Sequence, residues 1–128
     1  FVAVGEGGKI VRSSNYGSSW DNVTSGVDPW PPIGNYIFKG VAFGNNTFVA
    51  VGNSGKIIRS TDNGASWNSS NSPTSRHLYG VTFGNNTFVA VGSDGTVITS
   101  PDGITWTTRA SGSSPIYSNS LYGVTFSE

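Results

Sequence analysis

The feature that most constrains this chain is an internal repeat. The nonapeptide GNNTFVAVG occurs twice without change, at 44–52 and 84–92, and the chain begins with the last five letters of that phrase, FVAVG. Trp20, Trp67 and Trp106 follow one another at intervals of 47 and 39 residues. Three copies of one unit are therefore present, and a unit of roughly 40 residues is typical of a β-propeller blade or of one helical repeat.

Glycine and Asn-Gly breaks interrupt every stretch long enough for a helix, so the helical alternative is excluded. Each unit instead predicts four short strands. In the third unit these are Leu78–Phe83, the FVAVG stretch at 88–92, Thr96–Ser100 and a strand around Trp106–Arg109. The FVAVG strand has no polar face, which indicates burial on both sides of its sheet. The preceding GNNT predicts a tight turn, because Asn and Gly tolerate the positive φ that hairpins require.

A four-stranded antiparallel meander with a doubly buried second strand needs further sheets packed against both of its faces. Radially packed blades supply this arrangement. The sequence therefore predicts an all-β fold, a β-propeller with three four-stranded antiparallel blades in a single segment, 1–128. The blade units are 1–24, closed by 121–126, then 38–70 and 78–110. The start is permuted, because the second strand of a blade comes first and the first strand of a blade comes last.

Three blades are fewer than the four to eight that typically close a propeller ring. Two expectations follow and stay open at this point. In the first, a head-to-tail homodimer forms a six-bladed ring in which the LYGVTF segment of each chain, 121–126, completes the first blade of the other. In the second, these residues are part of a longer repeat protein.

Composition excludes several classes of protein. The seven Lys and Arg balance seven Asp and Glu, so the basic surface typical of a nucleic-acid-binding protein is missing. No run approaches the roughly 20 apolar residues that a membrane span needs. The chain has no cysteine, and His77 is its only histidine. Disulfides and thiolate sites are therefore excluded, and neither a metal ion nor a cofactor is expected.

The turn between the third and fourth strands carries a family resemblance. It reads SSNYGSSW, STDNGASW and SPDGITW in the three units. The second copy matches the Ser-x-Asp-x-Gly-x-x-Trp Asp-box of the BNR repeats, whereas the first has Asn15 in place of Asp and the third is one residue shorter. The chain thus resembles the blades of sialidases, xyloglucanase-type glycosidases, the sortilin luminal domain and photosystem assembly factors.

The resemblance implies a structural role for the motif, in which the Asp clamps the turn and the Trp packs between strands. Local chemistry favours the same role, because a short carboxylate or amide in a turn caps backbone N–H groups. The motif therefore identifies the fold and leaves the function open. Its residues are Ser13, Asn15, Gly17 and Trp20; Ser60, Asp62, Gly64 and Trp67; and Ser100, Asp102, Gly103 and Trp106.

Catalytic groups are not evident. The sialidases that the chain resembles need three arginines around a substrate carboxylate, but Arg12 and Arg59 occupy equivalent repeat positions, which favours a packing or surface role. Glycoside hydrolysis needs two facing carboxylates. Glu6 and Asp94 also occupy equivalent positions, between the second and third strands, where a polar turn residue is the simpler explanation. No catalytic residue is therefore predicted, and the chain is not expected to be an enzyme.

The connections from the fourth strand of one unit to the first strand of the next differ in length and content. They are 25–37, 71–77 and 111–120, and they share a face with the connections between second and third strands. Loops on a rigid scaffold usually carry binding, and an aromatic and polar set suits sugar stacking or peptide capture. The predicted ligand-binding residues are Trp30, Tyr36, Arg76, His77, Tyr117, Lys9, Lys56 and Asp94. Alternatively, Trp30 covers a blade edge or fills a subunit contact.

The favoured function is a non-catalytic binding or adhesion module on a secreted or cell-surface protein. Lectin-like carbohydrate binding through the variable loops is the expected activity, with a carbohydrate or a protein as the partner. Two alternatives stay open. The chain is a fragment of a BNR-type glycosidase whose catalytic residues lie on other blades, or it is an assembly scaffold like the photosystem assembly factors that it resembles.

Overall fold

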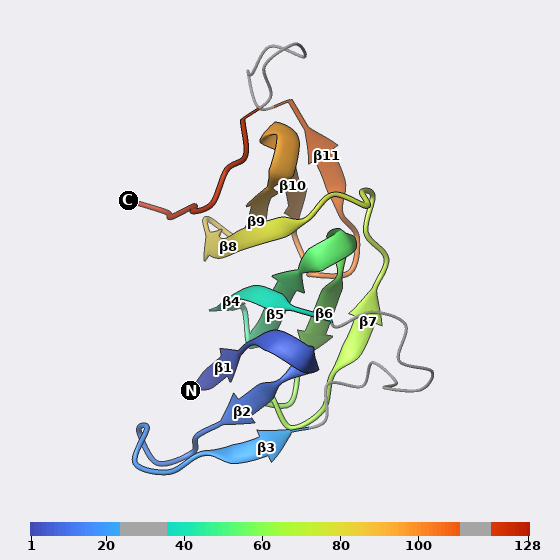
Figure 1. Cartoon of the computed structure of the whole chain (residues 1–128). Helices are drawn as coiled ribbons and strands as arrows, with labels where there is room; N and C mark the ends of the chain where they lie inside the picture. The colour runs from blue at the N-terminus through green and yellow to red at the C-terminus, as the bar shows by residue number, and fades with distance from the viewer. Residues whose placement is uncertain (24–35, 111–118) are drawn as a thin grey trace.

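The computed structural model describes residues 1–23, 36–110 and 119–128, and these residues form three antiparallel sheets (Figure 1). The first sheet contains β1 (Val2–Val4), β2 (Ile10–Arg12) and β3 (Asp21–Val23). The second contains β4 (Phe38–Gly44), β5 (Thr47–Gly52), β6 (Ile57–Ser60) and β7 (Asn68–Ser70). The third contains β8 (Leu78–Gly84), β9 (Thr87–Gly92), β10 (Val97–Ser100) and β11 (Thr107–Arg109). Each sheet is a meander in chain order, and the predicted blade architecture is confirmed.

The repeated Asn-Asn pair sets the hairpin between the first two strands of a full blade. Asn45 and Asn46 have φ of 50° and 55°, and Asn85 and Asn86 have φ of 47° and 57°. Two consecutive residues with positive φ are the hallmark of the type I′ turn, whose twist matches that of the flanking strands. The turn fixes the register, so that the FVAVG stretch pairs with the strand before it in both blades.

The hydrophobic core lies between the sheets. One cluster joins β5 and β6 of the second sheet to β8, β9 and β10 of the third, and the other joins β2 of the first sheet to the second. Val49 and Val51 of β5 belong to the first cluster, whereas Ala50, which points to the opposite face, belongs to the second. All three are fully buried. The prediction that the FVAVG strand is covered on both faces is confirmed for β5.

The first strands of successive blades approach one another closely. A Cβ atom on Gly40 would stand 3.3 Å from the Cα atom of Gly80, and one on Gly80 would stand 3.1 Å from the carbonyl oxygen of Tyr122. At these distances a side chain would press on the neighbouring backbone, so glycine permits the close approach at both positions. The segment 119–128 therefore lies beside β8 as β8 lies beside β4.

The predicted last strand, 121–126, takes this position but pairs with no other strand among the described residues. The amide of Leu121 donates to the carbonyl of Gly92 at 2.9 Å and anchors the start of the segment. Within the described parts of one chain, the first sheet accordingly has three strands. Closure of the unit 1–24 by 121–126 stays a prediction, because the described residues show no pairing between these two segments.

The turn between β6 and β7 is held by its own side chains. Asp62 Oδ1 accepts hydrogen bonds from the Ser66 amide at 2.9 Å and from Ser60 Oγ at 2.8 Å. The Gly64 amide donates to Ser60 Oγ at 2.9 Å, and Trp67 Nε1 donates to the Gly64 carbonyl at 3.0 Å. The Ser66 hydroxyl donates to Asp62 Oδ2. This bond, followed by those from the Ser66 amide and the Ser60 hydroxyl, lowers the pKa of Asp62 to about 2. The carboxylate thus acts as an acceptor inside its own turn.

The turns that contain Asn15 and Asp102 are held by equivalent hydrogen bonds, made by different atoms. Asn15 Oδ1 accepts from the Ser19 amide at 2.9 Å, so an uncharged amide replaces the carboxylate. In the shorter third turn, Asp102 Oδ1 accepts from the amides of Ile104 and Thr105 at 2.8 and 2.9 Å. Backbone hydrogen bonds from these two residues lower the pKa of Asp102. Each turn therefore supplies an acceptor for amides that its tight geometry leaves unpaired.

Candidate functional site

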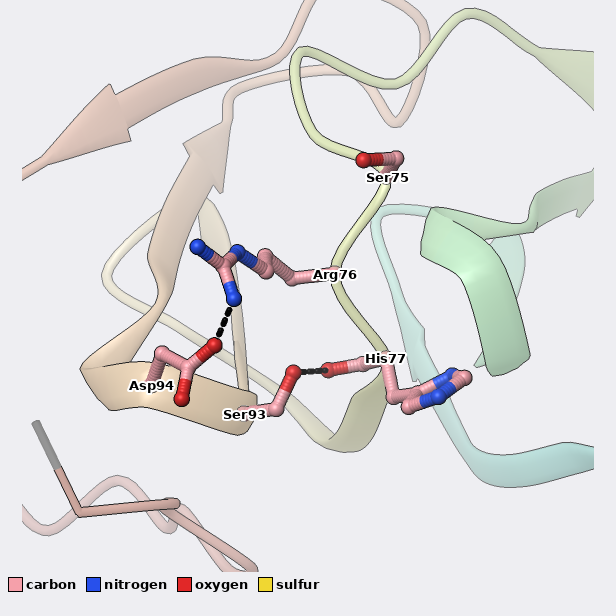
Figure 2. A pocket seen from close by; sticks show the side chains of 5 residues that line it. All are labelled: Ser75, Arg76, His77, Ser93 and Asp94. Carbon is pink, nitrogen blue, oxygen red and sulfur yellow. Dashed lines mark hydrogen bonds and ion pairs between the residues drawn. The ribbon is translucent and has the colours of Figure 1, made fainter.

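The connection from the fourth strand of one sheet to the first strand of the next lies on the same face as the connection between second and third strands, as predicted. The segment between β7 and β8 runs past η3 (Ser93–Gly95), the short turn between β9 and β10, and the Ser93 amide donates to the His77 carbonyl at 2.9 Å. An open hollow of about 470 Å³ lies between them (Figure 2). It is lined by Ser75, Arg76, His77, Ser93 and Asp94.

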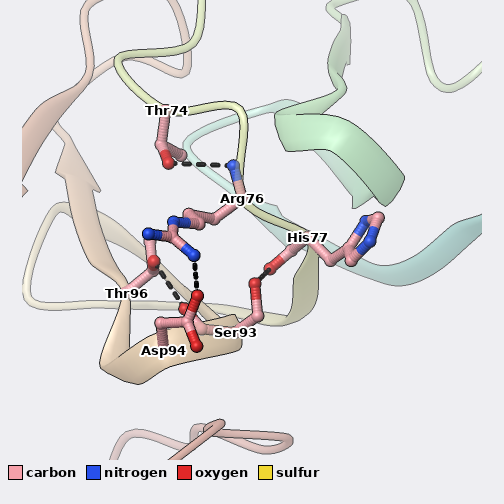
Figure 3. A network of polar contacts seen from close by, with 6 residues as sticks. All are labelled: Thr74, Arg76, His77, Ser93, Asp94 and Thr96. Atoms are coloured by element: carbon pink, nitrogen blue, oxygen red, sulfur yellow. Dashed lines mark hydrogen bonds and ion pairs between the residues drawn. The ribbon is translucent and has the colours of Figure 1, made fainter. Parts of the chain in front are cut away.

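An ion pair between Arg76 and Asp94 forms one wall of the hollow. The Arg76 backbone is held in turn, because its amide donates to Thr74 Oγ1 at 3.0 Å (Figure 3). The two charged side chains are 59% and 42% exposed, respectively. An ion pair with this much water contact contributes at most about 1 kcal/mol to stability. Arg76 and Asp94 can therefore each give up this ion pair and bind a charged group of a ligand instead.

His77 connects this hollow to the neighbouring blade. Its ring points away from Arg76 and toward η2 (Asn53–Gly55), the corresponding turn of the second sheet (Figure 2). The Ser54 amide donates to His77 Nδ1 at 3.0 Å. Since Nδ1 accepts this bond, Nε2 is the second ring nitrogen that can hydrogen-bond. His77 thus ties two blades together.

The remaining predicted residues form separate contacts. Lys56 Nζ lies 5.0 Å from the centre of the Tyr36 ring and donates to Ser69 Oγ at 2.9 Å. Partial burial lowers the pKa of Lys56. Lys9 donates to Asn22 Oδ1 in the first sheet, away from the hollow. Trp30 and Tyr117 lie outside the described residues, so their assignment stays a prediction.

Sequence reasoning missed an aromatic pair next to His77. The rings of Tyr79 and Tyr122 are stacked, with centroids 4.9 Å apart and planes at 27°. The His77 ring lies 6.3 Å from that of Tyr79, and Tyr122 is 71% exposed. The repeated triplet Leu-Tyr-Gly, at 78–80 and 121–123, is the signal that could have found this pair.

The described residues offer binding groups and no metal centre. No cluster of three or more His, Cys, Asp or Glu side chains occurs in the part of the chain that the structure covers. The carboxylates of Asp62 and Asp102 are engaged in their own turns. The groups that line the hollow and can contact a ligand are thus Arg76, Asp94 and the imidazole of His77, which can form hydrogen bonds and ion pairs.

Stacked four-stranded antiparallel meanders, with their first strands side by side, define a β-propeller. Residues 19–128 match the DUF6242 beta propeller domain. The chain belongs to this family. Among the described residues, the structure contains no helix long and apolar enough to cross a membrane.

Solved structures of similar fold agree with this assignment. One is described as YCF48 bound to D1 peptide; it has a TM-score of 0.69 and 22% identity, over 84% of this chain and 34% of that one. Another is YCF48 from Cyanidioschyzon merolae, with a TM-score of 0.65 and 26% identity, over 84% of this chain and 32% of that one. The chain thus spans about a third of the length of these proteins. No curated protein matches the chain.

The comparisons confirm the propeller that the resemblance implied. They do not extend to the BNR repeats. Assignment of the three turns to the Asp-box of that family stays a prediction.

Proposed function

We propose that this chain is a non-catalytic protein-binding module that holds an extended peptide across the loop face around Arg76, His77 and Asp94. The observation that carries the proposal is the exposed Arg76–Asp94 pair in an open polar hollow. A charged pair on a rigid sheet scaffold is positioned in advance, so a ligand does not have to order it. Placement on a secreted or surface protein belongs to the same proposal.

A peptide suits this face better than a small metabolite. The hollow is open and polar, whereas small-molecule sites are mostly enclosed and apolar. His77 also connects the hollow to the next blade, so an extended ligand can contact two blades at once. The similar structure of YCF48 bound to D1 peptide supports the same class of ligand.

The test is selection of peptides from a phage-displayed library on the purified chain, followed by fluorescence anisotropy with the enriched peptide. Arg76→Ala is expected to weaken binding of an acidic peptide by at least about ten-fold, because a hydrogen bond to a charged group contributes about 1.5–3 kcal/mol. Arg109→Ala is the matched control, since Arg109 is exposed on β11 and donates to Thr99 Oγ1. Failure to enrich any peptide, or equal affinities for both variants, would refute the proposal.

The variant Asp94→Ala tests whether the site prefers acidic or basic peptides. The substitution releases Arg76 from its partner, so it is expected to strengthen binding of an acidic peptide and to weaken binding of a basic one. Unchanged binding of either kind of peptide would place the ligand elsewhere on the propeller.

A second candidate, lectin-like carbohydrate binding, is favoured by Tyr122, which stacks on Tyr79 and is 71% exposed. Aromatic faces of this kind can stack on the apolar face of a sugar ring. A glycan array probed with the chain and with Tyr122→Ala tests it. Binding that Tyr122→Ala abolishes supports a lectin, and an array without signal removes this candidate. A glycosidase role would depend on catalytic residues on blades outside this chain.

A further inference from the structure

The stacked rings of Tyr79 and Tyr122 form a contact that the proposed peptide site does not use. Their centroids lie 4.9 Å apart and their planes meet at 27°, which is a close and nearly parallel arrangement for two aromatic rings. The rings come from parts of the chain that are far apart in the sequence, β8 and the segment 119–128. The fold therefore holds two phenol rings face to face.

The backbone sets the spacing of these rings. Each tyrosine directly precedes a glycine, Gly80 or Gly123, where neighbouring segments of the chain lie close together. A Cβ atom on Gly80 would stand 3.1 Å from the carbonyl oxygen of Tyr122 and 3.4 Å from the Cα atom of Gly123. The amide of Leu121 donates to the carbonyl of Gly92 at 2.9 Å. Backbone contacts on either side of Tyr122 thus hold its ring against that of its partner.

The composition makes this pair a target for oxidation. The chain contains no Cys and no Met, the side chains whose sulfur atoms oxidants readily attack. Trp67 and Trp106 are buried, with exposed fractions of 4% and 8%. The Tyr79 side chain is half-buried and that of Tyr122 is exposed. Among the described residues, tyrosines and Trp20 are therefore the easily oxidised groups that a reagent in solution can reach.

We propose that Tyr79 and Tyr122 form a site of oxidative cross-linking, at which a one-electron oxidant joins the two rings as dityrosine. Each phenol gives up one electron and one proton and becomes a phenoxyl radical. The two radicals combine through a carbon–carbon bond between positions ortho to the hydroxyls. The hydrogens on those two carbons then move to the oxygens, which restores both phenols. In total, two electrons reduce the oxidant and two protons pass to water.

The stacking favours this pair over the other described tyrosines. Coupling between two groups that the fold already holds together is intramolecular, and the effective molarity of such a reaction far exceeds any protein concentration. Tyr16 is 93% exposed, but no other aromatic ring lies beside it among the described residues. The Tyr36 ring instead faces the Lys56 amine, 5.0 Å away. Coupling through Tyr16 or Tyr36 therefore requires a second chain and depends on protein concentration.

The cross-link stabilises the third sheet. Tyr79 lies in β8, the first strand of this sheet, and Tyr122 follows β11, the last one. A bond between their rings closes a loop that contains all four strands. Closing a loop restricts the unfolded chain and so favours the folded one. The oxidised chain is therefore expected to unfold at a higher temperature than the reduced chain.

The test is photo-oxidation of the dilute, purified chain with a ruthenium tris-bipyridyl complex and persulfate. Dityrosine fluorescence and intact mass are then measured. The expected product has the mass of one chain less two hydrogen atoms. Trypsin cuts after Lys and Arg, so Tyr79 is recovered in the peptide 77–109 and Tyr122 in the peptide 110–128. These two peptides are expected to remain joined after digestion.

Tyr122→Phe is expected to lower the yield of dityrosine by about ten-fold or more, because phenylalanine keeps the stacked ring but forms no phenoxyl radical. Tyr79→Phe should have the same effect. Tyr16→Phe is the matched control and should keep the full yield. Tyr117→Phe should also keep it, and this variant removes the other tyrosine of the peptide 110–128. Each variant is first checked for native circular dichroism.

A full yield of dityrosine in Tyr122→Phe overturns the proposal, as does a product that has mainly twice the chain mass. Loss of tyrosine without joined peptides overturns it as well. The chain unfolded in urea is expected to lose the cross-link, and an equal yield there would mean that the fold does not position the rings. None of these results bears on the peptide proposal, because the variants leave Arg76 and Asp94 unchanged.

Discussion

Replacing Gly103 with alanine tests whether contact between blades, rather than turn geometry alone, stabilises this fold. Gly103 has φ of +76°, and a Cβ there would stand 2.9 Å from Val49 Cγ2 and 3.3 Å from Arg59 Cδ of the neighbouring blade. The left-handed conformation costs a residue with a side chain about 1–2 kcal/mol. Overpacking against fully buried Val49 adds about 1–3 kcal/mol. Gly103→Ala is therefore expected to destabilise the chain by about 2–5 kcal/mol.

Gly7→Ala is the matched control. Gly7 has φ of +64°, and a Cβ there meets nothing within 4 Å, so this variant carries only the conformational cost. Urea unfolding followed by fluorescence of the buried Trp67 and Trp106 measures both free energies, with an unchanged m-value as the check on the unfolded state. If the two variants lose the same stability, the inter-blade contact at Gly103 contributes nothing and the reasoning is wrong.

Three further predictions follow from single contacts. The folded-state pKa of Asp62 is depressed to about 2, so its contribution to stability is present above about pH 4 and is lost as pH falls toward 2. Thermal unfolding should therefore show a melting temperature that falls across this range. Asp62→Asn should reduce that fall. Arg59→Ala removes the 2.9 Å bond from Arg59 Nε to the Asp102 carbonyl and should cost about 0.5–1.5 kcal/mol in urea unfolding. His77→Ala leaves the Ser54 amide without its acceptor, so hydrogen exchange of that amide should accelerate while the rest of the second sheet keeps its protection.

The strands could be predicted from sequence because their signals are local. The pair Asn45 and Asn46 sets a turn through backbone conformation alone, and the following apolar run can only be a buried strand. The predicted strand 96–100 is observed as Val97–Ser100, one residue shorter. The predicted last strand, 121–126, was different. It has the sequence of a first strand, but a strand requires a ladder partner, and the described residues place none beside it.

The candidate site was predictable in part. Meander topology places Arg76 and His77 on the same face as Asp94, and the structure brings these three residues together. The stack of Tyr79 on Tyr122 was not anticipated, because it depends on the distance between first strands of neighbouring blades. The link from Ser54 to His77 was missed for the same reason.

By itself, the sequence determined the period, the strands, their turns and the order in which they pair, since each depends on residues a few positions apart. Only the tertiary structure decided which side chains meet across blades: Arg59 with the Asp102 carbonyl, Ser54 with His77, and the two stacked tyrosines. The physical reason is that a repeat period specifies one blade, whereas the rotation and spacing between blades result from packing. Close approach at Gly40 and Gly80, together with the apolar clusters between sheets, sets that geometry.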